Sequence, residues 1–249
     1  MNKLYKKNEV IFAIIMIVIY VVGTSIAESV TANIQIEKLV PAIFHITLSI
    51  IVLAWVIKNG YAEKFGLIVP QYKLTKAWFF IPLILVACSG LLFGIKLQYK
   101  PFETVLYVIS MVCVGFLEEI IFRGFLFVGM AKKNVKSAII VSSLTFGIGH
   151  IVNLLNGQPF IETMVQIVFA VAVGFTLVII FYKGKSLLPC IVFHALNNSL
   201  SAFEKTNEEA AATLSISVEQ FEMIITSAFI VILIIYALSM LKTFKVKQE

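Results

Sequence analysis

Two adjacent glutamates and the only arginine of the chain lie within one apolar stretch, VGFLEEIIFRG at residues 114–124. Glu119 and Arg123 are four residues apart, so on a helix they share one face and can form an ion pair. Glu118 is rotated by about 100° from Glu119 on an ideal helix and is left without that partner. The pattern therefore predicts a structural role for Glu119 and a chemical role, as general base or acid, for Glu118. An interhelical ion-pair network and a proton relay are the alternatives.

A second candidate is His150, in the segment TFGIGHIVN at 145–153. Gly147 and Gly149 beside it allow helices to approach closely, which suits packing as well as a site. A single histidine on an apolar face more often belongs to the core. His150 is therefore a candidate only in combination with the other motifs.

The third candidate is the pair His194 and Asn198, in CIVFHALNNS at 190–199. The two residues are four apart and share a helix face, and both side chains can donate hydrogen bonds. Two donors that converge in a dry cavity can stabilise a developing oxyanion. Hydrogen bonding between helices is the alternative. His45 has no polar companion in a comparable pattern, and we assign it to packing.

The amino-acid counts exclude several kinds of site. All 14 acidic residues are Glu, 19 of the 20 basic residues are Lys, and there are three His. Without Asp the chain cannot form an aspartyl dyad, a Ser-His-Asp triad or an Asp-based metal or phosphate site. No H-E-x-x-H motif and no serine nucleophile motif is present. Cys88, Cys113 and Cys190 lie in apolar stretches, where we expect small buried side chains and no disulfide framework.

The elements that must position these residues are membrane helices. Hydrophobic residues make up 60% of the 249 residues and charged residues only 14%, against about 45–50% and about 25% in soluble proteins. Apolar runs near the ~20 residues of a membrane span, without period-two alternation, indicate helices and exclude a β-barrel. We predict an all-α polytopic membrane protein with one transmembrane domain over 1–249 and an intramembrane active-site cavity. The eight apolar segments are about 9–26, 42–57, 78–97, 104–130, 137–155, 161–182, 186–202 and 223–241.

The lysines predict the orientation of these helices. With the N-terminus inside, 15 lysines fall on the inner side and four on the outer side, as the positive-inside rule requires. We therefore expect both termini in the cytoplasm, a multi-pass protein of the cell membrane (a bacterial plasma membrane), and a first apolar segment retained rather than cleaved as a signal peptide. The net charge of +6 then reflects the lysines that set the membrane orientation. We expect the lipid bilayer as a partner and expect no binding of nucleic acid.

The candidate residues are expected at one depth. Glu118 and His150 each lie 14 residues from the nearest inner-side lysine, and Asn198 lies 13 residues from it, which corresponds to roughly 20 Å along a helix. His194 lies one turn nearer the cytoplasm. If the helices are neighbours, these groups can converge.

The three patterns together resemble those of the CPBP family, the CAAX proteases and bacteriocin-processing enzymes also called the Abi family, which includes the type II CAAX prenyl endopeptidases. The segment at 118–123 matches E-E-x-x-x-R, 146–150 matches F-x-x-x-H, and 194–198 matches H-x-x-x-N. The motif-bearing core covers about 115–200. Each motif is weak alone, but three in order at membrane depth are specific.

The resemblance implies an intramembrane endopeptidase that acts on a peptide or a membrane-associated protein. In such an enzyme Glu118 and His150 activate the attacking water, while His194 and Asn198 form the oxyanion hole. Peptide hydrolysis does need a base, a water and an oxyanion partner. Because bacteria do not routinely prenylate proteins, a prenylated CAAX substrate is not expected.

The resemblance also implies that Arg123 and Glu119 support the site. Family members are often labelled metalloproteases, and Glu118, His150 and His194 could ligate zinc with a water in the fourth position. We favour a glutamate-dependent mechanism without metal, because these three residues come from separate helices with no tight ligand spacing. Zinc is the alternative cofactor.

Two other function classes stay open. A non-catalytic protein of the same fold could serve as a bacteriocin self-immunity factor or as a scaffold for partner helices, but the intact motifs favour an enzyme. A proton-coupled transporter could use Glu118 as a relay, but the sequence shows no inverted repeat or paired broken helices.

Overall fold

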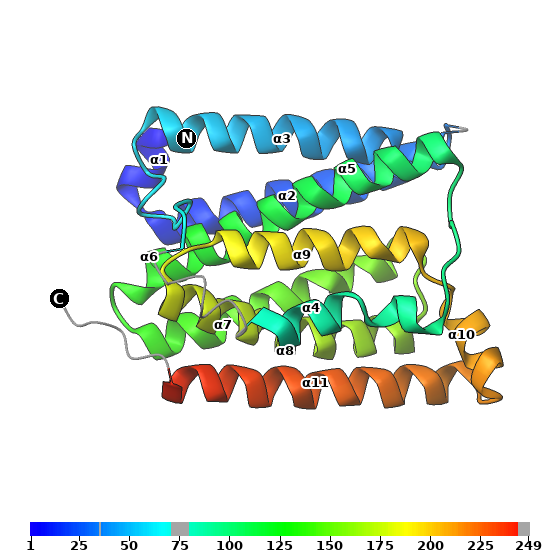
Figure 1. Ribbon diagram of the computed structural model, residues 1–249. Helices are drawn as coiled ribbons and strands as arrows, with labels where there is room; N and C mark the ends of the chain where they lie inside the picture. The colour runs from blue at the N-terminus through cyan, green and yellow to red at the C-terminus, as the bar shows by residue number, and fades with distance from the viewer. Residues whose placement is uncertain (35, 71–79, 244–249) are drawn as a thin grey trace.

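The structure is a computed structural model that describes residues 1–34, 36–70 and 80–243. Over these residues the chain is mainly helical. An isolated antiparallel β-bridge joins Ile95 to Glu204. The long helices run side by side in one bundle, as Figure 1 shows. The predicted all-α polytopic membrane fold is therefore confirmed.

Within the described residues, six helices are long and apolar enough to cross a membrane. They are α2 (Glu9–Thr31), α3 (Leu39–Lys58), the continuous helix Pro101–Ala131, the helix Val135–Leu154, α8 (Phe160–Gly184) and α11 (Val218–Thr243). Pro101–Ala131 consists of α5 (Pro101–Glu118), a π-helical segment η3 (Glu119–Phe127) and α6 (Val128–Ala131). Val135–Leu154 consists of α7 (Val135–Ile148) and the 3-10 segment η4 (Gly149–Leu154).

The other two predicted segments are shorter than expected. Segment 78–97 forms α4 (Ile81–Ala87) and the 3-10 segment η2 (Ser89–Phe93), and its first two residues lie outside the described residues. Gly94 has a φ of 126°, so the helical path ends there. Segment 186–202 forms α9 (Leu188–Leu200), whose 13 residues cover about 20 Å, less than the ~30 Å hydrocarbon core. The count of eight spanning helices is therefore not confirmed.

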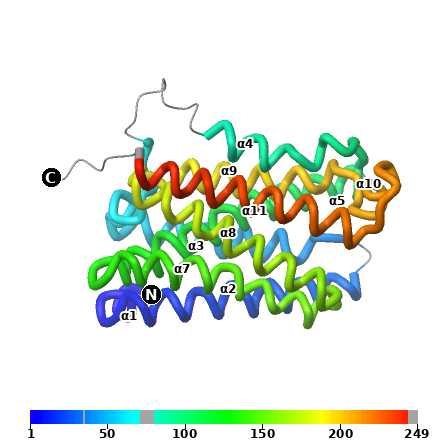
Figure 2. The backbone as a smooth tube through the Cα atoms, turned by 90° about the horizontal axis from the view of Figure 1, so that it is seen from below, coloured from blue at the N-terminus to red at the C-terminus, as the bar shows by residue number. Residues whose placement is uncertain are grey.

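One end of the bundle is tied together by charged residues. Glu9, the first residue of α2, lies 2.8 Å from Lys64 Nζ and 2.7 Å from Lys132 Nζ. These ion pairs join the start of α2 to the segment after α3 and to the turn between α6 and α7. The helix α1 (Asn2–Lys7) and the C-terminal end of α11 lie at the same end of the bundle in Figures 1 and 2.

Short elements close the opposite end. The 3-10 segment η5 (Ser201–Phe203) and α10 (Asn207–Leu214) connect α9 to α11, and α10 lies at this end in both ribbon views (Figures 1 and 2). Backbone hydrogen bonds from Lys96 to Phe203 (2.9 Å) and from Gln98 to Ala202 (3.0 Å) attach the segment after η2 to η5. A capping box, in which Thr206 and Glu209 bond each other's backbone N–H, starts α10.

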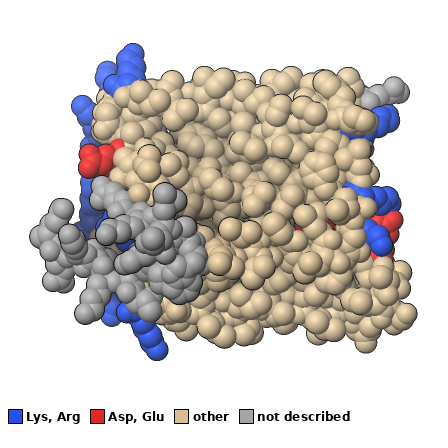
Figure 3. Space-filling model, viewed as in Figure 1, with Lys and Arg blue, Asp and Glu red and all other residues tan. Residues whose placement is uncertain are grey.

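The outer surface of the bundle is apolar between its two ends. On the face shown in Figure 3, Lys and Glu gather at the two ends, and the broad middle is almost entirely without their colours apart from a little red in a hollow. The side chains of this surface include Ile50 and Ile57 on α3 and Ile235 on α11, which are 62–63% exposed. Such a large exposed apolar band is typical of a surface in contact with lipid.

The predicted orientation can be tested by cysteine labelling. With the three native cysteines replaced by serine, Ala212→Cys on α10 should react with a membrane-impermeant maleimide added to intact cells, because we expect α10 outside. Lys133→Cys, in the turn between α6 and α7, should react only after the membrane is permeabilised. Both side chains are exposed on the surface of the structure. The reverse pattern of labelling would show that the predicted orientation is wrong.

Candidate active site

The EE motif lies where the regular helix gives way to a π-helix. Glu118 is the last residue of α5, and all nine residues of the following π-helical segment, Glu119–Phe127, are buried. The wider π-helical turn changes the backbone pairing, and Ser142 Oγ on α7 donates a hydrogen bond of 2.9 Å to the carbonyl of Phe122. Such π-helical turns occur frequently at functional sites.

Glu119 and Arg123 form the predicted ion pair. Arg123 NH1 donates to Glu119 Oε1 at 2.9 Å, and both side chains are fully buried. The guanidinium also donates to the backbone carbonyl of Gly174 on α8 at 3.3 Å and lies 4.2 Å from the centre of the Phe146 ring. Arg123 therefore connects the π-helical segment to α7 and α8.

His194 on α9 lies between the two adjacent glutamates. Its Nδ1 is 2.9 Å from Oε1 of Glu119, and its Nε2 is 3.4 Å from Oε2 of Glu118. An ideal helix would turn these carboxylates about 100° apart, yet both contact the same imidazole. The contact brings α9 and the π-helical segment together at their most polar point.

Glu118 has a second partner that the sequence did not indicate. Tyr20 on α2 donates its hydroxyl to Oε1 of Glu118 at 2.5 Å. The two residues are 98 positions apart. In the sequence, the only indication that Tyr20 has a role in the site is its polar hydroxyl in the middle of an apolar helix. Oε2 of Glu118 is buried and accepts no hydrogen bond within the described residues.

His150 lies in η4, at the end of the α7 helix. Its Nδ1 is 3.1 Å from the backbone carbonyl of Phe146, one turn earlier. If Nδ1 donates to that carbonyl, Nε2 is the ring nitrogen available to a water or substrate. Phe146 packs edge-on against both His150 and His194, so one aromatic ring contacts both imidazoles.

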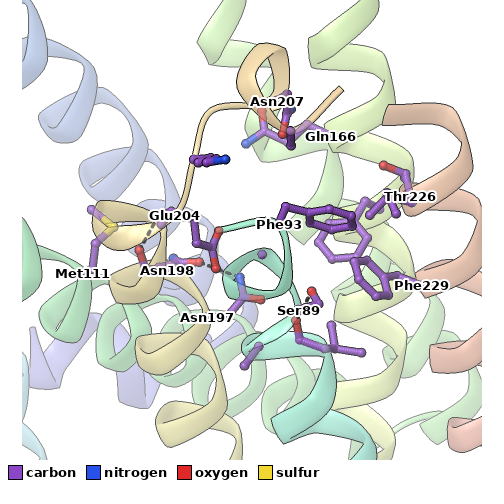
Figure 4. Close-up of a pocket in the computed structure, with 18 of the residues that line it drawn as sticks. Ser89, Phe93, Met111, Gln166, Asn197, Asn198, Glu204, Asn207, Thr226 and Phe229 are labelled. Carbon is purple, nitrogen blue, oxygen red and sulfur yellow. Dashed lines mark hydrogen bonds between the residues drawn. The ribbon is translucent and has the colours of Figure 1, made fainter. Parts of the chain in front are cut away.

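The four predicted catalytic side chains line one cavity of about 490 Å³ inside the bundle: Glu118, His150, His194 and Asn198. Glu118 and His150 also line a second, smaller cavity of about 90 Å³. In the larger cavity, Figure 4 shows Asn198 and Met111 on one side, with Phe93, Phe229 and Thr226 on the other. The structure therefore brings these four side chains together at one cavity.

Asn198 lies one turn after His194 on α9. Its Oδ1 accepts a hydrogen bond of 3.2 Å from the side chain of Asn197. This contact occupies the oxygen of the Asn198 amide and leaves its NH₂ group as a donor toward the cavity. His194 and Asn198 thus share the face that the i, i+4 spacing predicts.

His45 lies in a separate buried cluster. Its ring nitrogens are 3.0 Å from Thr24 Oγ1 and 2.8 Å from Ser110 Oγ. His45 has no polar neighbour within its own segment, and its hydrogen-bond partners come instead from α2 and α5. His45 lines neither cavity, which agrees with the packing role assigned to it.

The alternative zinc site has no geometric support in the described part of the chain. No three His, Cys or Glu side chains there lie in an arrangement that could hold a metal ion. Within the same residues Cys88, Cys113 and Cys190 are free thiols.

The central region of the chain matches a known family. Residues 100–200 match the model of a family described as type II CAAX prenyl endopeptidase Rce1-like. The resemblance stated from the three motifs is thereby confirmed, since the matched region contains all of them. The chain has no significant match among curated proteins or among solved structures.

The buried ion pair predicts a large loss of stability when one partner is removed. Arg123→Met should lower the free energy of unfolding in detergent by about 3–5 kcal/mol, because Glu119 would stay buried without its charge partner. Lys132→Met is the control, because it removes an ion pair with Glu9 whose lysine is 55% exposed and should cost at most about 1 kcal/mol. Equal losses for the two variants would contradict this interpretation.

Proposed function

We propose, on the premise that residues 100–200 belong to the type II CAAX prenyl endopeptidase Rce1-like family, that the chain is an intramembrane endopeptidase. Its hydrolytic residues are Glu118, His150, His194 and Asn198. The observation that carries the proposal is that these four side chains, from three separate helices, line one cavity inside an apolar bundle. The cavity would receive a segment of a peptide or of a membrane-associated protein.

The reaction begins with a water molecule held between Glu118 and His150. Oε2 of Glu118 accepts no hydrogen bond among the described residues, and its charged neighbour is His194 Nε2 at 3.4 Å. In the proposed reaction this oxygen accepts a proton from the water. The resulting hydroxide attacks the carbonyl carbon of the scissile peptide bond. The proton then passes to the leaving nitrogen, the C–N bond breaks, and a carboxylate and an amine are released.

His194 and Asn198 stabilise the tetrahedral intermediate. As an imidazolium, His194 donates Nδ1–H to Glu119 and keeps Nε2–H for the oxyanion. The NH₂ group of Asn198 is the second donor, and its orientation is supported by the contact with Asn197. Two preorganised donors directed at the oxyanion lower the energy of the developing negative charge.

Glu119 and Arg123 act through His194. Arg123 holds Glu119, and Glu119 fixes the Nδ1 side of the imidazole. This chain of contacts sets the direction of Nε2. None of the described contacts favours the alternatives of an immunity factor, a scaffold or a transporter over hydrolysis.

Removal of the base should abolish most of the activity. In liposomes containing quenched fluorescent peptides with an apolar segment, Glu118→Gln and His150→Ala should each lower kcat by about 10²–10⁴-fold, because neither can help to deprotonate the water. Glu162→Gln on α8, an exposed glutamate, is the control and should cleave like the wild type. Equal cleavage by all four proteins would show that the assignment to these residues is wrong.

The proposed mechanism also predicts insensitivity to chelators. Cleavage by the wild-type protein should be unchanged after incubation with a zinc chelator, because no step depends on a metal ion. The initial rate before and after chelation is the measurement. Loss of activity that added zinc restores would contradict the glutamate-dependent mechanism and favour the metal alternative.

A further inference from the structure

Tyr20 contacts the proposed base from outside the region that matches the family. It lies on α2, is 6% exposed and donates to Oε1 of Glu118 at 2.5 Å. The matched region begins at residue 100, so neither the family match nor the three motifs assign Tyr20 any role.

The contact distinguishes the two oxygens of the carboxylate. Oε1 accepts the hydrogen bond from Tyr20, whereas Oε2 is buried and without a hydrogen-bond partner among the described residues. A carboxylate free to rotate would present either oxygen to a water. Here the phenol donates a hydrogen bond to Oε1, whereas Oε2 has only the longer contact of 3.4 Å with His194 Nε2. Oε2 is therefore the oxygen that we assign as proton acceptor.

Tyr20 itself is held in place by a network that includes His45. Thr24, one turn after Tyr20 on α2, is 3.0 Å from His45, and His45 is 2.8 Å from Ser110 on α5. The His45 ring also lies beside the Tyr20 ring, with the centroids 6.0 Å apart. Because Ser110 is two turns before Glu118 on α5, the helices α2 and α5 are joined at two levels.

The cavities show that Tyr20 does not face the substrate. The larger cavity is lined by Glu118 and His150 but not by Tyr20. Of these two cavities, Tyr20 lines the smaller one, together with Glu118, His150 and Thr24. The hydrogen bond to Glu118 is therefore the contact by which its hydroxyl can act on a reaction in the larger cavity.

We propose that Tyr20 is a positioning residue of the hydrolytic centre, whose hydroxyl fixes Oε1 of Glu118 and so keeps Oε2 directed at the attacking water. The inference rests on the proposed endopeptidase function. It extends the site to α2, a helix that contributes none of the three motifs.

Tyr20→Phe tests this role because it keeps the ring and removes only the hydroxyl. A lost hydrogen bond to a charged group corresponds to about a ten- to hundredfold decrease in kcat, with KM unchanged and the protein still folded in detergent. Tyr5→Phe is the matched control, since Tyr5 is also buried (3% exposed) but does not contact Glu118.

The double variant tests whether Tyr20 acts through Glu118. When Tyr20→Phe is added to Glu118→Gln, kcat should decrease no further. A kcat equal to that of the wild type, or a decrease equally large in the Glu118→Gln background, would overturn the proposal.

An infrared measurement separates this inference from the function itself. The difference spectrum between wild type and Glu118→Gln isolates the carboxyl bands of Glu118, and these bands should shift in Tyr20→Phe but not in Tyr5→Phe. If the wild type cleaves no peptide while the bands shift, the proposed function fails and the positioning of Glu118 by Tyr20 stands. Unshifted bands would overturn the positioning role whether or not the protein cleaves peptides.

Discussion

Charge buried in an apolar bundle must be paired, and the centre of this protein is organised by that requirement. Arg123 and Glu119 are both fully buried and 2.9 Å apart. Their pairing leaves Glu119 able to accept from His194, and His194 in turn approaches Glu118. The neighbouring helices α5, α8 and α9 take their relative positions from this chain of contacts, because a shift of any one of them would leave a buried charge without its partner.

The same requirement explains how one stretch of sequence can provide both stability and chemistry. Glu119 is held on a helix that it shares with its partner, whereas Glu118 is held from α2 by Tyr20. One oxygen of Glu118 is buried without a hydrogen-bond partner among the described residues, and the residue lines both cavities. Oε2 of Glu119 also lacks a hydrogen-bond partner there, so the position of Glu118 on both cavities is what distinguishes it as a group that can bind water during a reaction.

Local spacing predicted much of this arrangement, and tertiary contacts account for the rest. The Glu119–Arg123 pair and the shared face of His194 and Asn198 follow from i, i+4 geometry, and the membrane class follows from composition. Tyr20 could not be predicted, since its partner lies 98 residues away. The ends of α9 could not be predicted either, because an apolar run of near-spanning length does not reveal where a helix begins or ends within it.

An experimental structure of the protein with ordered water at the site would test the central claim most directly. The account predicts one water molecule within about 2.6–3.2 Å of both Oε2 of Glu118 and a ring nitrogen of His150, on the side of the larger cavity. Separation of Oε2 from the His150 ring by more than about 10 Å, with no water shared between them, would contradict it, since a base must reach its water within hydrogen-bond distance.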